Sequence, residues 1–165
     1  MLLLIDVAGE PWVADVGFGG IGLLEPIPLL ADRDFHFPLV SFRLTREGGL
    51  WVLHAQQLGE WIELYVFSLE PQERIDYAVS HYYTSTYPDS LFVKTLTAQL
   101  VTPGQRLTLR KGDLAVLTAA GLERRHYGSS AEVVTLLREM FGLDLPPDTR
   151  FAESLFADRG WAPHS

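Results

Sequence analysis

Trp12-Val13-Ala14-Asp15-Val16-Gly17-Phe18-Gly19-Gly20 is the stretch on which the fold and the candidate site depend. An apolar strand carries one carboxylate, Asp15, near its end, and a glycine loop with a single aromatic residue, Phe18, follows it. An acid at a strand end, beside backbone that can approach a ligand closely, is common in active sites. Most glycine loops after strands are plain turns, so the stretch taken alone favours a structural role.

Asp15 has two readings. In the structural one, its carboxylate accepts hydrogen bonds from N–H groups of the loop and shapes the turn. In the functional one, it orients a catalytic imidazole as the third member of a nucleophile, base and acid set. No histidine of the sequence stands out as its partner.

The first sixteen residues read as a hairpin. Met1 to Val7 is a strand, Ala8 to Pro11 has turn chemistry, and Trp12 to Val16 is the returning strand. Antiparallel pairing then brings Asp15 near the start of the chain, so a residue preceding Met1 would be its neighbour. A chain that begins inside an apolar strand, which we expect to be buried, suggests a truncated form.

Composition narrows the class of protein. The 165 residues fit one domain or two small ones that share a core, and 47 % of them are apolar. A net charge of −8 argues against nucleic acid or an anionic membrane as the partner. The absence of cysteine excludes disulfides, thiolate metal sites and cysteine nucleophiles within these residues and is compatible with a cytoplasmic protein. The apolar run Met1 to Ile5 is too short for a signal peptide or a membrane span.

Alternation and turn signals predict most of the elements. Further strands are expected over three segments, Leu39 to Thr45, Leu50 to Gln56 and Trp61 to Phe67, with Trp61, Glu63, Tyr65 and Phe67 on one side. Together with the hairpin they predict an antiparallel barrel or curled sheet.

The second half of the chain reads differently. A helix is expected over 73–83, a polar loop over 84–92, and strands over 91–101, 106–110 and 113–118. A last helix begins at Ser129 with a capping box to Glu132, and Gly142 is its expected C-terminal cap. Residues 151–165 are expected to form an exposed tail, although Phe156 and Trp161 could dock.

Other catalytic and metal motifs are missing. None of the five histidines stands at metal-ligand spacing, and no serine lies in a nucleophile elbow. The loop from Gly17 to Gly22 does not open a dinucleotide-binding helix, because Pro26 and Pro28 follow it. We expect no metal.

Several motifs, in this order, resemble the arylamine N-acetyltransferase family. The similarity runs from Met1 to about Pro146. It is carried by Val13-Ala-Asp15-Val-Gly17-Phe18-Gly19-Gly20, Pro26-Ile-Pro28-Leu, Trp61-Ile-Glu-Leu-Tyr65-Val-Phe67, Asp76-Tyr77, Tyr83-Thr-Ser85-Thr-Tyr-Pro88-Asp-Ser90-Leu-Phe92 and Val133-Val-x-x-Leu-Leu-Arg-x-x-Phe141-Gly142.

The resemblance implies an α+β fold in which an antiparallel β-barrel is followed by a smaller α/β lid. The core would be like that of papain-type cysteine proteinases, and this chain would lack the family's N-terminal helical bundle. On this basis we expect a partial barrel domain over 1–79, an interdomain segment over 80–92, and a lid with a C-terminal helix over 93–165.

The resemblance also implies a reaction. In the family, acetyl-CoA acylates the cysteine of a Cys-His-Asp triad, and the acetyl group passes to an arylamine or hydrazine. Asp15 stands at the position of the family's aspartate. Gly17, Phe18, Gly19 and Gly20 match the loop that lines the acceptor pocket and approaches the coenzyme, and Ser90 and Phe92 match a segment that faces the same cleft.

One departure from the family decides what we expect of the isolated chain. The resemblance places the family's histidine just before Met1, and its cysteine farther upstream. With neither residue the chain cannot form the acetyl-thiol intermediate, so we predict that it is inactive alone. Three explanations remain open: a truncated acetyltransferase, one subunit of a split acetyltransferase, or a non-catalytic remnant that binds a CoA-like ligand or a partner. In each case we expect an exposed apolar barrel face, which would bind an N-terminal fragment or drive self-association.

Overall fold

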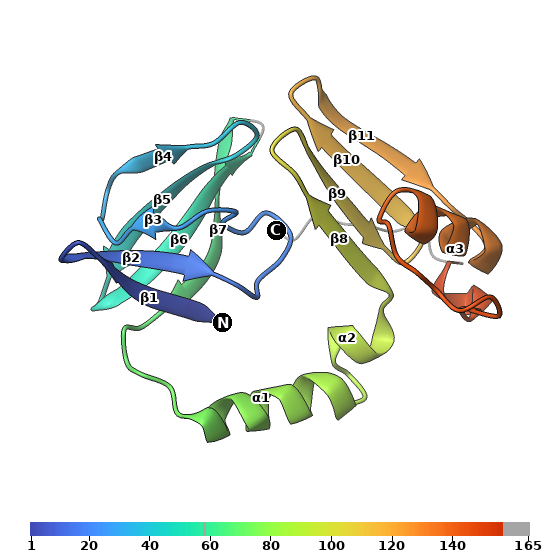
Figure 1. The fold of residues 1–165 in the computed structure, drawn as a ribbon, viewed down its shortest axis with the longest axis horizontal. Coiled ribbons are helices and arrows are strands. Elements are labelled where there is room, and N and C mark those ends of the chain that lie inside the picture. Colours follow the sequence, from blue (N-terminus) through green and yellow to red (C-terminus); the bar gives the residue numbers. More distant parts are fainter. Residues whose placement is uncertain (58, 157–165) are drawn as a thin grey trace. The chain divides into compact units, whose positions relative to one another are not determined.

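The structure is a computed structural model and describes residues 1–57 and 59–156. The chain forms two compact units (Figure 1). Unit 1 consists of residues 1–71, 101–105 and 118–121, and unit 2 of residues 72–100, 106–117 and those from 122 onward. Antiparallel sheets and a few helices place the chain in the α+β class, as the sequence predicts.

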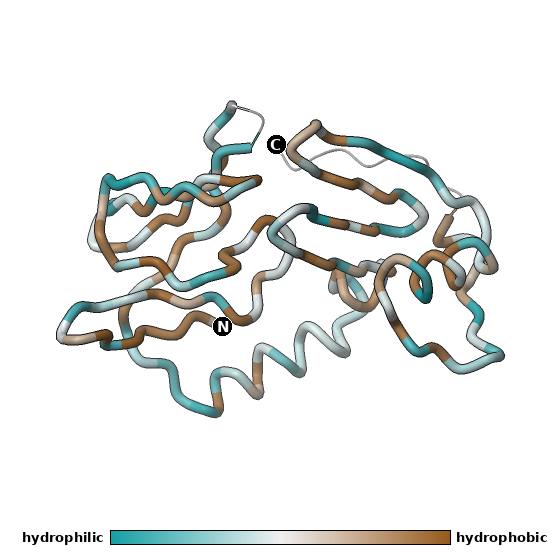
Figure 2. Tube along the Cα trace, turned by 45° about the horizontal axis from the view of Figure 1, so that its top comes forward, coloured by the Kyte–Doolittle hydropathy of each residue, from teal (hydrophilic) through white to brown (hydrophobic). Residues whose placement is uncertain are grey.

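The first sheet of unit 1 has the strand order β1-β2-β3. β1 (Leu2–Val7) and β2 (Glu10–Asp15) form the expected hairpin, and β3 (Ile27–Pro28) lies in the proline-rich segment that follows the glycine loop. The expectation that β1 is buried is wrong, because five of its six residues are exposed. Figure 2 shows the apolar run along this strand.

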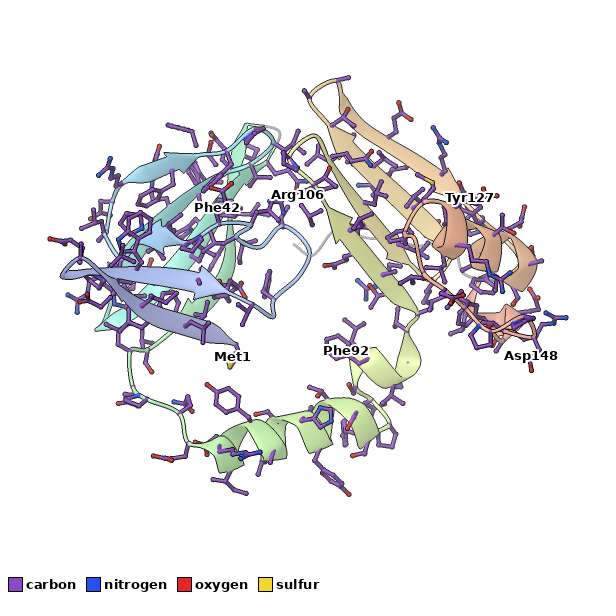
Figure 3. All side chains as sticks on the ribbon, in the orientation of Figure 1. Met1, Phe42, Phe92, Arg106, Tyr127 and Asp148 are labelled. Atoms are coloured by element: carbon purple, nitrogen blue, oxygen red, sulfur yellow. The ribbon has the colours of Figure 1, made fainter. Side chains whose placement is uncertain are left out.

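The second sheet of unit 1 has the order β4-β5-β6-β7. Its strands are β4 (Asp34–His36), β5 (Ser41–Glu47), β6 (Leu50–Gln57) and β7 (Glu60–Phe67). Phe42 and Leu44 of β5 and Leu53 of β6 are almost fully buried and form its core. Figure 3 labels Phe42 in this sheet. The strands expected from the sequence do not include β4. One isolated bridge, Ala31–Leu44, links β5 to the segment after β3, and closure of a barrel stays a prediction.

A bulge changes the pattern expected along β7. The pairs Ala55–Ile62 and Leu53–Tyr65 leave an extra residue on β7, where the register shifts between Leu53 and His54. Cross-strand partners share a face, so Tyr65 lies on the face of Leu53 while Trp61 lies on the other. The expectation that Trp61, Glu63, Tyr65 and Phe67 share one side is therefore wrong.

Unit 2 begins with α1 (Arg74–Thr86) and the short α2 (Leu91–Lys94). A capping box between Glu73 and Asp76 starts α1, which extends three residues beyond the expected end and has no buried residue. The strand expected from Leu91 is wrong at its start, because Ser90 caps a helical turn there. The strand β8 (Thr97–Val101) begins only after this turn.

The third sheet has the strand order β11-β10-β9-β8. The sequence predicts the strands β9 (Gln105–Arg110) and β10 (Asp113–Thr118). It does not predict β11 (Gly121–His126), because most residues of that strand are polar; four of the six are also exposed. α3 (Ser130–Glu139) starts at the expected cap, Ser129, and Gly142 follows it with a positive φ.

The core of unit 2 lies between its sheet and α3. It is formed by Leu107, Leu109, Leu114, Val133, Leu136, Leu137, Phe141 and Phe156. Phe156 follows a 3-10 turn, Glu153–Leu155, and is only 2 % exposed, so the segment docks rather than forming an exposed tail up to this point. Trp161 lies outside the described residues.

Candidate active site

Asp15 lies at the end of β2, close to the start of the chain. It pairs with Leu2 in the β1–β2 ladder, and the N–H of Val16 donates to the carbonyl of Met1 over 3.1 Å. The hairpin prediction about the position of Asp15 is therefore confirmed.

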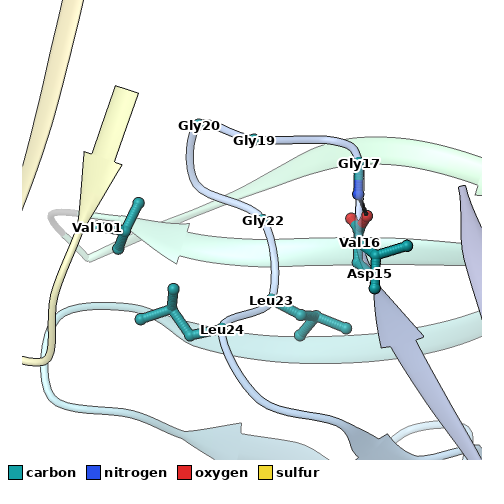
Figure 4. A pocket seen from close by; sticks show the side chains of 9 residues that line it. All are labelled: Asp15, Val16, Gly17, Gly19, Gly20, Gly22, Leu23, Leu24 and Val101. Atoms are coloured by element: carbon teal, nitrogen blue, oxygen red, sulfur yellow. Dashed lines mark hydrogen bonds between the residues drawn. The ribbon is translucent and has the colours of Figure 1, made fainter. Parts of the chain in front are cut away.

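Three donors hold the Asp15 carboxylate. The N–H groups of Gly17 and Phe18 both donate to Oδ1 over 3.0 Å, so the carboxylate closes the turn at the strand end. Figure 4 shows Asp15 beside Gly17. The hydroxyl of Tyr65 donates to Oδ2 over 2.8 Å. The loop hydrogen bonds expected for Asp15 are thus present and hold the side chain in one orientation, and its role in orienting a histidine stays a prediction.

Tyr65 is the residue of the site that sequence reasoning missed. The bulge in β7 directs it toward Asp15, and its ring packs on Phe18 with centroids 4.7 Å apart. Burial, reinforced by the hydrogen bond to Asp15 and its charge, raises the pKa of Tyr65 far above its ordinary value. Tyr65 therefore remains a protonated donor to the carboxylate at physiological pH.

The glycine loop after Asp15 is folded tightly. Gly19 and Gly20 have φ values of +70° and +56°, which glycine adopts without strain. A Cβ on Gly22 would stand 2.9 Å from the carbonyl oxygen of Gly19 and 3.4 Å from Asp15 Oδ2. Glycine at this position lets the loop return against the carboxylate.

A pocket of about 390 Å³ opens at this loop. The stretch from Asp15 to Leu24 supplies most of its lining (Figure 4). Its volume falls in the range of small-molecule sites. The structure therefore brings Asp15, Gly17, Gly19 and Gly20 together around one cavity, with Phe18 half exposed beside them.

Ser90 and Phe92 belong to unit 2. The Ser90 hydroxyl donates to the carbonyl of Thr84 over 2.6 Å and accepts from the N–H of Phe92 over 3.3 Å. Ser90 is buried and acts as the N-terminal cap of α2, whereas Phe92 is 67 % exposed. A cleft shared by these two residues and the loop of unit 1 stays a prediction.

Three of the described histidines bond to side chains away from Asp15. His36 contacts Ser41, His54 contacts Thr45, and His126 contacts Asp113, all within 2.9 Å. In residues 1–57 and 59–156, no group of three or more His, Asp or Glu side chains is arranged to hold a metal ion. No helix in the same part of the chain is both long and apolar enough to cross a membrane.

Comparison with known proteins gives the family. The N-acetyltransferase family model, Acetyltransf_2, matches residues 1–150. The arylamine N-acetyltransferase of Mycolicibacterium smegmatis is 42 % identical over 134 residues, which are 81 % of this chain and 49 % of the relative. A Salmonella typhimurium relative, named arylamine N-acetyltransferase / N-hydroxyarylamine O-acetyltransferase, is 33 % identical over 152 residues, 86 % of this chain and 51 % of the relative.

Solved structures agree with the sequence match. The structure of the M. smegmatis arylamine N-acetyltransferase superposes with a TM-score of 0.85 at 38 % identity, covering 94 % of this chain and 58 % of that one. The Mycobacterium marinum arylamine N-acetyltransferase in complex with CoA gives a TM-score of 0.81 at 33 % identity, over 86 % of this chain and 53 % of that one. The chain spans about half the length of the curated relatives it matches. It belongs to the N-acetyltransferase family whose matched members are arylamine N-acetyltransferases.

Proposed function

We propose that this chain supplies the acid and part of the substrate pocket of an arylamine N-acetyltransferase site. The observation that carries the proposal is the carboxylate of Asp15, fixed by Gly17, Phe18 and Tyr65 beside a pocket, in a chain of this family. Acids held in this way at the end of a strand are suited to orient a histidine.

The carboxylate has capacity for one more donor. An ionised carboxylate offers about four lone-pair positions, and within residues 1–57 and 59–156 the bonds from Gly17, Phe18 and Tyr65 occupy two on Oδ1 and one on Oδ2. The remaining position on Oδ2 suits the N–H of an imidazole. Such a bond would select the tautomer whose other nitrogen takes a proton from a thiol, and the negative charge would stabilise the imidazolium that forms.

The reaction then has two balanced steps. A cysteine thiolate attacks the carbonyl carbon of acetyl-CoA, the C–S bond to coenzyme A breaks, and the imidazolium returns a proton to the departing thiolate. An arylamine or hydrazine nitrogen next attacks the acetyl-thiol, gives its proton to the imidazole, and releases the cysteine thiolate. Since these 165 residues hold no cysteine, the thiol has to come from outside them.

The glycine loop is the proposed contact for the coenzyme and the acceptor. Gly17, Gly19 and Gly20 line the pocket without side chains, so a pyrophosphate or the thioester arm can approach their backbone closely. The M. marinum relative was solved in complex with CoA, which supports acetyl-CoA as the donor. Ser90 and Phe92 are proposed to face the same ligands. We further propose a cytoplasmic, metal-free enzyme whose first unit closes into a barrel and whose second unit acts as a lid.

The test measures release of free coenzyme A from acetyl-CoA with an aromatic amine or a hydrazine as acceptor. The isolated chain should show no turnover. Joined to the half of the M. smegmatis relative that it does not match, it should show turnover that Asp15→Asn lowers by roughly 10⁴-fold. Turnover by the isolated chain, or full activity of the Asp15→Asn variant, would refute the proposal.

A second candidate is a non-catalytic module that binds a CoA-like ligand. The observation in its favour is a formed pocket and glycine loop in residues that hold no cysteine. Calorimetric titration of the isolated chain with coenzyme A separates the two. Tight binding together with no turnover in the joined protein would favour the binding module.

A further inference from the structure

The pocket beside Asp15 has a polar end and an apolar end. Asp15 and Gly17 line the polar end, and Leu24 and Val101 line the end away from the carboxylate (Figure 4). All nine lining residues belong to unit 1, so this unit forms the cavity from its own residues. A ligand that fits the pocket therefore carries a polar group at one end and an apolar body at the other.

Val101 reaches the pocket from a distant part of the chain. It is the last residue of β8, and among the described lining residues it alone lies outside the stretch from Asp15 to Leu24. Hydrogen bonds close the turn that follows: the N–H of Thr102 donates to the carbonyl of Gln105 over 2.9 Å, and the N–H of Gln105 donates to the Thr102 hydroxyl over 3.2 Å. A side chain held between a paired strand and a closed turn has little freedom to move away from a ligand. Val101 is therefore a fixed side of the pocket.

The proposed reaction decides which way an acceptor lies in the pocket. The acceptor nitrogen gives its proton to an imidazole that Asp15 orients, so this nitrogen lies at the polar end. The rest of the acceptor then extends toward Leu24 and Val101. Each methylene buried against these side chains increases affinity by up to about fourfold. A fixed side chain at the far end limits how many such groups fit.

We propose that Val101 is the specificity-determining residue of this pocket and sets the size of the substituent that an aromatic amine carries opposite its nitrogen. The inference rests on the proposed function and adds to the site a residue from outside the glycine loop. The best fit is an amine whose substituent is apolar and unbranched. A carboxylate in the same place would find no cationic side chain among the nine lining residues, so it would be buried without a partner.

The first measurement is binding to the chain itself, followed by two-dimensional ¹H–¹⁵N NMR, with aniline, 4-ethylaniline and 4-butylaniline as probes. Affinity should rise roughly two- to fourfold with each added carbon, and the amide signals of Leu24 and Val101 should shift. Val101→Phe shortens the apolar end and should remove this rise. Val79→Phe is the matched control, because Val79 is 64 % exposed on α1, and it should leave the series unchanged. Thermal unfolding verifies that both variants fold.

A smaller substitution tests the same residue without adding bulk. Val101→Ala widens the apolar end, so the branched 4-tert-butylaniline should gain at least threefold in affinity relative to 4-butylaniline. A charged probe of matched length, 4-(4-aminophenyl)butanoate, should bind the wild-type chain at least tenfold more weakly than 4-butylaniline. Both results follow from an apolar end whose width Val101 sets.

Three results would overturn the assignment of Val101: no binding of any aniline, equal affinities along the series, or the same response to Val101→Phe and Val79→Phe. Turnover by the protein joined to the M. smegmatis half separates this inference from the proposed function. Binding selectivity that depends on Val101, without turnover that depends on Asp15, would leave the assignment in place and refute the proposed function. Turnover whose kcat/KM series is unaffected by Val101→Phe would refute the assignment and leave the proposed function in place.

Discussion

Replacing Tyr65 with phenylalanine removes one hydroxyl and leaves the ring that packs on Phe18. The lost bond is a neutral donor to a carboxylate, 2.8 Å long and half-buried, for which a contribution of about 1.5 kcal/mol to the free energy of unfolding is expected. In a chain of this length that corresponds to roughly 3–6 °C in Tm. Tyr82→Phe is the control, because Tyr82 is 72 % exposed on α1 and its substitution should change stability by less than about 0.5 kcal/mol.

The assay is denaturant unfolding of both variants, repeated at increasing pH. Burial and Asp15 raise the pKa of Tyr65, so the folded state keeps a proton that the unfolded state loses above pH 10.0. The stabilisation from Tyr65 is therefore fully present below that pH and declines above it. The difference between the wild-type chain and Tyr65→Phe should shrink above about pH 10. Equal stabilities of Tyr65→Phe and Tyr82→Phe at pH 8 would refute the assignment of Tyr65 as the residue that holds Asp15.

Three further substitutions test other parts of the structure. Gly22→Ala forces its new Cβ to within 2.9 Å of a carbonyl oxygen and should cost about 1–3 kcal/mol in denaturant unfolding, whereas Gly104→Ala meets open space and should cost little. Ser90→Ala removes a helix cap and should lower stability by about 1 kcal/mol, with faster amide exchange in α2 as the local readout. The hydrogen bond from Arg43 lowers the pKa of Asp34, so Asp34→Asn should be less stable than the wild-type chain above pH 3.8, and acid titration should show this difference vanishing as pH falls below that value.

Local signals in the sequence predict much of the fold. The hairpin that brings Asp15 beside Leu2 follows from alternation and turn residues, and α3 follows from the Ser129 cap. β11 could not be predicted in this way, because its polar, exposed residues carry no alternation. The sequence does not predict the start of α2. The residues after Ser90 favour a strand, but the buried Ser90 hydroxyl caps a helical turn there.

The candidate site was predictable only in part. The hydrogen bonds within the loop from Asp15 to Gly20 join residues two or three positions apart, so the local sequence is enough to predict them. Tyr65 reaches Asp15 from 50 residues away, and it does so because a bulge in β7 reverses the side on which it lies. A bulge is set by the pairing of two strands and leaves no clear sign in either one. The expected alternation along β7 is therefore wrong at the position that matters most for the carboxylate.

The burial of Phe156 bears on the timing of folding during synthesis. This ring completes a cluster whose other members begin at Leu107, so the ribosome has to release almost fifty more residues before the cluster can close. The earlier hairpins of the chain emerge first and can pair while translation continues. The second unit is thus expected to reach its final packing late, and a translational pause shortly before the codon for Phe156 would prolong the life of a partly open form.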